Sequence, residues 1–269
     1  MSVRTAAVAG TFYPAEVSEL SAQIQHDLST VSSELKPVSG FPAAIIVPHA
    51  GYIYSGQTAA FAYQTIQNAP IRRVALFGPA HRVAFYGMAV PEVSQYETPL
   101  GSITIDKEMS SQALEHPEVV SSDKPHALEH SLEVQLPFLQ TVLGDFSLLP
   151  VCVGMVEPEA VAAVMRKFLQ QPEILVVISS DLSHFHGYEK ANALDQYTVD
   201  AILDLKGPLQ HEQACGATGI NALMLIAKAD KLAVKLLDYR NSGDTAGDKL
   251  RVVGYASLGF YAQEEVVTV

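Results

Sequence analysis

Three short uninterrupted runs of apolar residues stand out along the chain, and a histidine follows each run within a few residues. The runs cover residues 43–47, 74–77 and 174–178, and the first and third are rich in β-branched residues. The histidines that follow them are His49, His81 and His184. Short runs that are hydrophobic at every position are typical of strands buried on both faces of a parallel sheet. The pattern therefore predicts three buried strands, each leading directly into a polar loop.

These three histidines are far apart in sequence, but a parallel arrangement of their strands would bring them together. The carboxyl ends of parallel strands share one edge of the sheet, and open α/β sheets bind their ligands at that edge. We therefore expect His49, His81 and His184 to converge.

The loop after the first run is expected to be long. Pro48 cannot donate to a strand ladder and should end the strand. Gly51 and Gly56 are expected to form tight turns in this loop, with Tyr52 and Tyr54 as polar tips. The next helix is then expected to begin only at residue 58.

The rest of the chain alternates between helix-like and strand-like periods. Helices are predicted at residues 15–35, 58–68, 107–115, 158–170, 188–205 and 220–229, with Asp106 as an N-cap. Further strands are predicted within residues 85–90, 101–105, 146–153, 231–239 and 251–261. A helical pattern also covers 129–143, where Pro137 should either kink the helix or mark its true start. This alternation predicts a single α/β domain over residues 1–269, with a mixed or parallel central sheet and helices on both faces.

Composition excludes several classes of protein. The net charge is −12 and Lys and Arg do not cluster, so nucleic-acid binding has little support. The apolar runs fall well short of the ~20 residues that span a bilayer. The N-terminus has no apolar segment of signal-peptide length, which predicts a cytoplasmic protein that does not bind membranes. Two cysteines make no disulfide framework.

The three strand-end histidines are the first candidates for chemistry. A neutral imidazole is the commonest metal ligand and also the commonest general base near neutral pH. Any one of them could simply close its strand and bond nearby backbone. Three of nine histidines in equivalent positions favour a functional set.

The two cysteines differ in their surroundings. Cys215 lies among small residues at a predicted helix N-terminus, where the dipole and free amides would favour a thiolate. It could be a metal ligand, a nucleophile or a small buried hydrophobe. Cys152 lies in the middle of a predicted strand and is expected to be an inert core residue.

Acidic residues near these positions have two interpretations each. Asp181 precedes His184 by three residues and could orient an imidazole or cap its own turn. Glu129, His130 and Glu133 open a predicted helix, where the acids could cap the helix or belong to a site.

Taken together, these stretches resemble the Memo family, whose bacterial members are also called AmmeMemoRadiSam system protein B. The resemblance covers nearly the whole chain from about residue 4. The motifs that carry it are Pro48-His49-Ala50-Gly51-Tyr52-x-Tyr54-x-Gly56, Gly78-Pro79-x-His81, Glu129-His130-Ser131-Leu132-Glu133-x-x-Leu136-Pro137, Ser179-Ser180-Asp181-x-x-His184 and Cys215-Gly216.

The resemblance implies a fold similar to that of class III extradiol ring-cleaving dioxygenases, which use non-haem iron. It implies that His49, His81 and Cys215 match the metal-ligand positions. His184 matches the catalytic histidine of those dioxygenases, and Asp181 lines the same pocket. The dioxygenases use a carboxylate as third ligand, and a thiolate there shifts the preference toward copper(I) or zinc.

Three hypotheses follow. The leading one is a metal-binding protein with one copper or iron ion (zinc is the third option), a small-molecule or peptide ligand in the metal cleft, and redox chemistry with oxygen if it is an enzyme. The second is a non-enzymatic peptide- or protein-binding module whose aromatic contacts come from Phe12, Tyr13, Tyr52 and Tyr54. The third is a thiol hydrolase with Cys215 as nucleophile and His184 as base.

Overall fold

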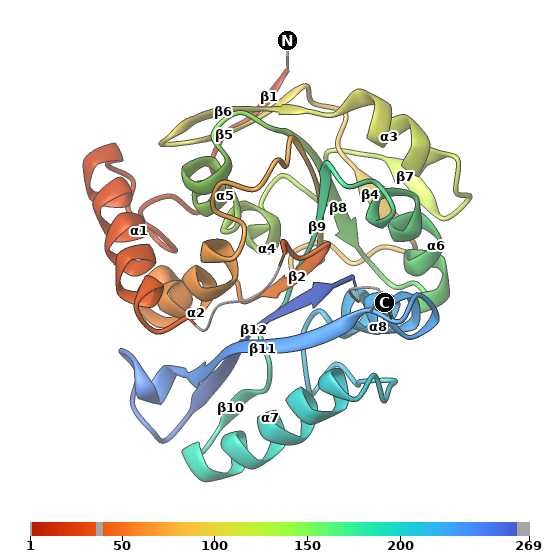
Figure 1. Cartoon of the computed structure of the whole chain (residues 1–269). Coiled ribbons are helices and arrows are strands. Elements are labelled where there is room, and N and C mark those ends of the chain that lie inside the picture. Colours follow the sequence, from red (N-terminus) through yellow and green to blue (C-terminus); the bar gives the residue numbers. More distant parts are fainter. Residues whose placement is uncertain (1, 36–39, 263–269) are drawn as a thin grey trace, which may run out of the picture.

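A mixed sheet of twelve strands forms the centre of the molecule (Figure 1). The computed structural model describes residues 2–35 and 40–262. The main path through the sheet runs β1-β5-β6-β8-β3-β9-β2-β12-β10. The predicted α/β class, with a mixed sheet and helices on both faces, is confirmed.

The middle of the sheet holds the three runs recognised in the sequence. They form β2 (Ala44–Val47), β3 (Arg73–Pro79) and β9 (Ile174–Ser179). In the sheet β9 lies between β2 and β3 and is parallel to both. Beyond β3 lies β8 (Ser147–Val153), which is also parallel, whereas β12 (Val252–Tyr261) runs antiparallel to β2. The predicted parallel arrangement of the three histidine-bearing strands is therefore confirmed.

Shorter strands extend the sheet on both sides. One edge carries β1 (Val3–Arg4), β5 (Gln95–Thr98) and β6 (Gly101–Ile105), and β4 (Met88–Val90) and β7 (Val119–Ser121) branch from β8. At the other edge β12 pairs with both β10 (His184–His186) and β11 (Ala233–Asn241). A short 3-10 turn, η1 (Ser242–Asp244), follows β11.

Helices cover both faces of the sheet, and the central strands β2, β3, β8 and β9 contribute side chains to both cores. Side chains alternate along β2, so that Ala44 and Ile46 belong to one buried cluster while Ile45 and Val47 belong to the other. The first cluster packs under α3 (Lys107–Leu114), α6 (Pro158–Leu169), α7 (Tyr188–Leu203) and α8 (Ala217–Ala229). The second packs under α1 (Val17–Ser32), α2 (Tyr52–Gln64), α4 (His130–Glu133) and α5 (Leu136–Leu143).

The helix after β2 begins earlier than the sequence predicted. α2 starts at Tyr52, immediately after Gly51, so the expected long loop with a turn at Gly56 is wrong. Gly56 lies inside α2, where a Cβ atom would come within 2.9 Å of Asp27 Oδ2 on α1. The glycine therefore allows close packing of the two helices. Because α2 begins at Tyr52, the segment between β2 and α2 is only a few residues long.

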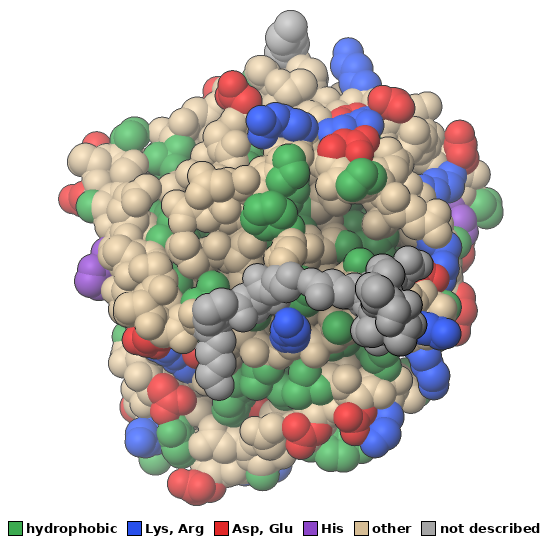
Figure 2. Space-filling view, in the orientation of Figure 1, with side chains coloured by type: hydrophobic (Ala, Val, Ile, Leu, Met, Phe, Trp, Pro, Cys, Tyr) green, Lys and Arg blue, Asp and Glu red, His purple; other side chains and the backbone are tan. Residues whose placement is uncertain are grey.

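Pro137 marks a helix start, one of its two expected roles. It lies in the first turn of α5, where the missing N–H costs nothing, and α4 is a separate short helix. None of the helices among the described residues combines the length and the apolar character that crossing a bilayer requires. On the face seen in Figure 2, Lys and Arg side chains are interspersed with Asp and Glu.

Asp106 caps α3 as expected, and it also joins α3 to the sheet. Its carboxylate accepts hydrogen bonds from Met109 N at 2.9 Å and from Ser147 Oγ at 2.6 Å. Arg73 binds both of its oxygens, at 2.7 and 2.8 Å. Burial alone would raise the pKa of Asp106, but these hydrogen bonds outweigh burial and lower it to about 2.

This pKa predicts how the stability of the fold depends on pH. The folded pKa lies below the unfolded one, so the stabilisation is present above about pH 4 and is lost as the pH falls toward 2. Asp106→Asn should lower the free energy of unfolding at pH 7 by about 1 kcal/mol after solvent screening. The difference from wild type should shrink between pH 4 and 2 in urea titrations. The exposed Asp145→Asn is the matched control, and a pH-independent difference for Asp106→Asn would contradict the assignment.

Candidate functional site

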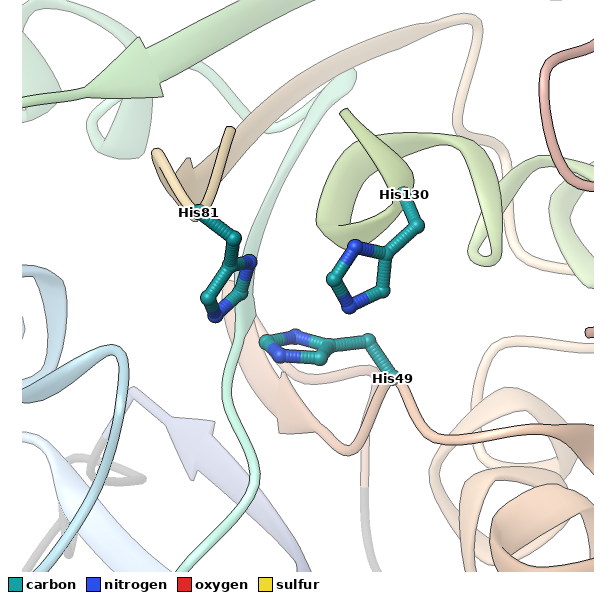
Figure 3. A group of neighbouring side chains, drawn as sticks. All are labelled: His49, His81 and His130. Carbon is teal, nitrogen blue, oxygen red and sulfur yellow. The ribbon is translucent and has the colours of Figure 1, made fainter. Parts of the chain in front are cut away.

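Three imidazoles meet where the central parallel strands end (Figure 3). His49 follows β2, His81 follows β3, and His130 is the first residue of α4. The His49 and His81 ring centroids are 5.2 Å apart, and the rings of His81 and His130 stack at 4.7 Å. One nitrogen from each ring lies within 4.8 Å of the others, a spacing that a single metal ion could bridge.

Hydrogen bonds assign the tautomer of His49, which is almost fully buried. Its Nδ1 lies 2.8 Å from Ser179 Oγ. The Ser179 hydroxyl donates its only proton to the Ser131 carbonyl at 2.6 Å, so its oxygen must accept from His49. We therefore place the proton on Nδ1, which leaves a lone pair on Nε2. Burial, and then the neighbouring imidazoles, lower the pKa of His49 well below its usual value, so the ring is neutral.

His81 is held by a carboxylate at two points. Glu129 accepts the His81 amide at 2.6 Å and lies 2.9 Å from its Nδ1. The same carboxylate caps α4 by accepting the Ser131 amide at 3.0 Å. Burial opposes the charge on Glu129, but the bonds from His81 and Ser131 outweigh it and lower the pKa to about 2. Glu129 thus fills both roles left open by the sequence, and it directs His81 Nε2 toward the centre of the group.

His130 is the member of the group that sequence reasoning missed. Its Nδ1 is buried without a hydrogen-bond partner among the described residues, although Glu129 Oε1 lies 3.3 Å away. Burial is the main reason that the pKa of His130 falls to about 4. The ring of Phe12 packs on it at 4.6 Å. The available signal was the position of His130 beside Glu129 at a helix N-terminus; it follows no strand, so the strand-end rule could not find it.

Cys215 approaches the group from the side of His49. Its Sγ lies 3.2 Å from His49 Nε2, the nitrogen with the free lone pair, and accepts the Asp181 amide at 3.3 Å. Burial raises the pKa of the Cys215 thiol to about 12. The expected stabilisation of a thiolate at the start of α8 is outweighed, because the Gly216 amide lowers the pKa but burial raises it by more. Cys152 is fully buried within β8, as expected of a core residue.

Asp181 acts on the backbone of the site. It is almost fully buried and accepts the His49 amide at 2.7 Å, while burial raises its pKa to about 7. Asp181 thus fixes the backbone of His49 and forms no hydrogen bond to an imidazole among the described residues. His184 begins β10 at the edge of the sheet and lies close enough that its charge would lower the pKa of His49.

The N-terminal segment packs against the site. Glu133 on α4 is fully buried and accepts from Arg4 Nη1 at 2.7 Å and from Tyr13 Oη at 2.6 Å. Tyr52 donates its hydroxyl proton to the Val134 carbonyl at 2.7 Å. Tyr13 and Tyr52 are only 3% and 4% exposed, so neither offers the surface contact that the binding-module hypothesis assigned to them.

Comparison with known proteins identifies the family. The family model for Memo-like proteins matches residues 4–259. The chain belongs to the Memo family. It is 38% identical to a MEMO1 family protein of Thermoplasma volcanium, across 95% of this chain and 97% of that protein. It is 37% identical to a MEMO1 family protein of Aquifex aeolicus, across 97% and 100%. A crystal structure of an uncharacterized protein from Escherichia coli K12 is similar over 81% of this chain and 99% of that one, with a TM-score of 0.48 and 12% identity.

In this Memo-family chain, Glu129→Ala should release His81 and weaken α4. We expect His81 to redistribute from the Nδ1–H tautomer toward the Nε2–H tautomer, which ¹H–¹⁵N correlation of the imidazole nitrogens measures in metal-free protein. Loss of the helix cap alone should cost about 1 kcal/mol of stability in denaturant titrations. The exposed Glu118→Ala is the control. An unchanged His81 tautomer in Glu129→Ala would contradict the assigned role.

Proposed function

We propose that this Memo-family chain binds one transition-metal ion at the edge of the sheet where His49 and His81 meet. The observation that carries the proposal is the convergence of ring nitrogens within 4.8 Å, contributed by segments distant in sequence. The hydrogen bonds to the other ring nitrogens support it. Ser179 and Glu129 bind the Nδ1 atoms of His49 and His81, which leaves the Nε2 atoms available as metal ligands.

The third ligand in the proposal is Cys215, and His130 is the rival. Cys215 Sγ lies 3.2 Å from His49 Nε2, so the two atoms are close enough to hold one ion together. The thiol would lose its proton when the metal binds. His130 offers a buried nitrogen without a partner among the described residues. Two imidazoles and a thiolate suit copper or zinc, while iron is the metal of the dioxygenases whose fold the Memo resemblance implies.

We further assign redox chemistry with oxygen to the bound ion. Copper or iron held by three protein ligands would supply one-electron chemistry at an open position. His184 would move protons beside the metal, and the burial that lowers its pKa keeps its imidazole neutral. Asp181 would assist by fixing the His49 amide, and hence the direction of that ring.

The two rival functions have less support from the contacts. The binding module loses Tyr13 and Tyr52, which are buried. A thiol hydrolase would pair Cys215 with His49, the ring that it touches, in place of His184. Labelling of metal-loaded protein with a thiol-directed reagent distinguishes a thiol hydrolase from a metal site. Cys215 should be protected if it binds the metal and should react if it is a nucleophile.

Replacing His49 should abolish stoichiometric metal binding. His49→Ala removes a nitrogen that lies at the centre of the group, and two remaining ligands hold a transition metal weakly. Elemental analysis of protein purified without chelator or nickel resin measures the metal content. His26→Ala changes an exposed histidine on α1 and should retain wild-type content. Equal metal content in the two variants would refute the proposal.

Cys215→Ser and His130→Ala distinguish the two candidates for third ligand. Cobalt(II) bound to a thiolate shows a sulfur-to-metal charge-transfer band in the near ultraviolet. We expect the band in wild type and in His130→Ala, and its loss in Cys215→Ser with weaker binding. A band that is absent from wild type, together with loss of cobalt binding in His130→Ala, would assign the position to His130.

A further inference from the structure

A cleft of about 560 Å³ opens beside His81 and Cys215. Its walls come from the segment after β3, the segment after β8 and the start of α8. The lining residues with apolar side chains are Pro79, Ala80, Val83, Ala84, Phe85, Val153, Met155 and Val156. No Lys, Arg, Asp or Glu is among the described residues that line it.

The two apolar walls are fixed to each other by backbone hydrogen bonds. Met155 N donates to the Phe85 carbonyl at 2.9 Å, and Gly87 N donates to the Met155 carbonyl at 2.9 Å. At Gly154 a Cβ atom would lie only 2.4 Å from the Phe85 carbonyl oxygen, so the segments approach as closely as glycine allows. The Met155 side chain is nevertheless 53% exposed. The cleft is therefore preformed, and apolar surface faces its open side.

Four polar side chains also line the cleft, those of His81, His211, Cys215 and Thr218. The side chains of His211 and Thr218 make no hydrogen bond to another described residue, so both can bind a ligand. A narrower cavity of about 20 Å³ continues inward past Cys215, between Gly78 and Ser179. That volume holds about one water molecule. The cleft thus combines a broad apolar wall with a few polar groups beside the proposed ligands His81 and Cys215.

We propose that the cleft binds a small, mainly apolar organic molecule that carries no phosphate and presents one donor group to the metal edge. A volume of this size fits a single small molecule. The absence of charged side chains from the described lining disfavours phosphorylated and highly charged ligands, because burying their charges without partners is costly. His211 and Thr218 are placed to bind one polar substituent. The binding of the ligand's donor group to a metal rests on the proposed function, whereas the binding of its apolar part does not.

The test compares imidazole with 4-phenylimidazole on zinc-loaded protein. Both donate one nitrogen to a metal, and only the second carries an apolar ring that the cleft could bury. Burial of the phenyl group should strengthen binding by about ten- to a hundredfold in calorimetric titration. Imidazole-4-acetate, which carries a carboxylate in place of the ring, should gain nothing. Equal affinities for imidazole and 4-phenylimidazole would overturn the proposal.

A pair of variants locates the binding site. Met155→Asp places a charge on the apolar wall and should remove the advantage of 4-phenylimidazole while leaving imidazole affinity unchanged. Val17→Asp is the control, because Val17 has the same 53% exposure on α1. If Met155→Asp keeps the full advantage, the phenyl group binds elsewhere and the proposal fails.

Metal-free protein separates this inference from the metal proposal. The uncharged fluorophore N-phenyl-1-naphthylamine should bind in the cleft without metal, with fluorescence enhancement in wild type and Val17→Asp that is lost in Met155→Asp. Binding of this probe without any metal uptake would refute the metal proposal and retain the apolar cleft. Metal uptake without probe binding would refute the cleft proposal alone.

Discussion

The parallel alignment of β3, β9 and β2 is the constraint on which the rest of the molecule depends. Hydrogen bonds between neighbouring parallel strands fix their register, so Val47 lies beside Ser179, and Ile178 lies beside Phe77. The residues that follow these strands must therefore emerge at one edge. His49, His81 and Asp181 lie at that edge for this reason.

Two buried carboxylates on and beside α4 convert this edge into an ordered group. Glu129 joins the helix cap to the backbone and ring of His81, and Glu133 joins the helix to Arg4 and Tyr13. Each buried charge has several hydrogen-bond partners, which is what makes burial tolerable. Because both acids belong to one turn of helix, the orientation of His81 and the docking of the N-terminal segment are coupled through α4.

Sequence patterns revealed the sheet better than the site. The apolar runs before His49, His81 and Asp181 marked strands correctly because each run is too short for a helix and is closed by Pro, Gly or Ser residues. The start of α2 was misplaced because Gly51 and Gly56 are typical of turns. Gly56 instead lies inside α2, where it leaves room for the Asp27 side chain of α1. His130 was missed for a similar reason. Its place in the group depends on where α4 packs, which is a tertiary property.

The contact between His49 and Cys215 has a consequence for biosynthesis. The two residues are 166 positions apart, and Arg4 is separated from Glu133 by 129. A ribosome-bound chain that already exposes His49 and His81 therefore lacks the sulfur until most of the polypeptide has emerged. The contact between His49 and Cys215 can therefore form only late in synthesis, after the residues around position 215 have left the ribosome.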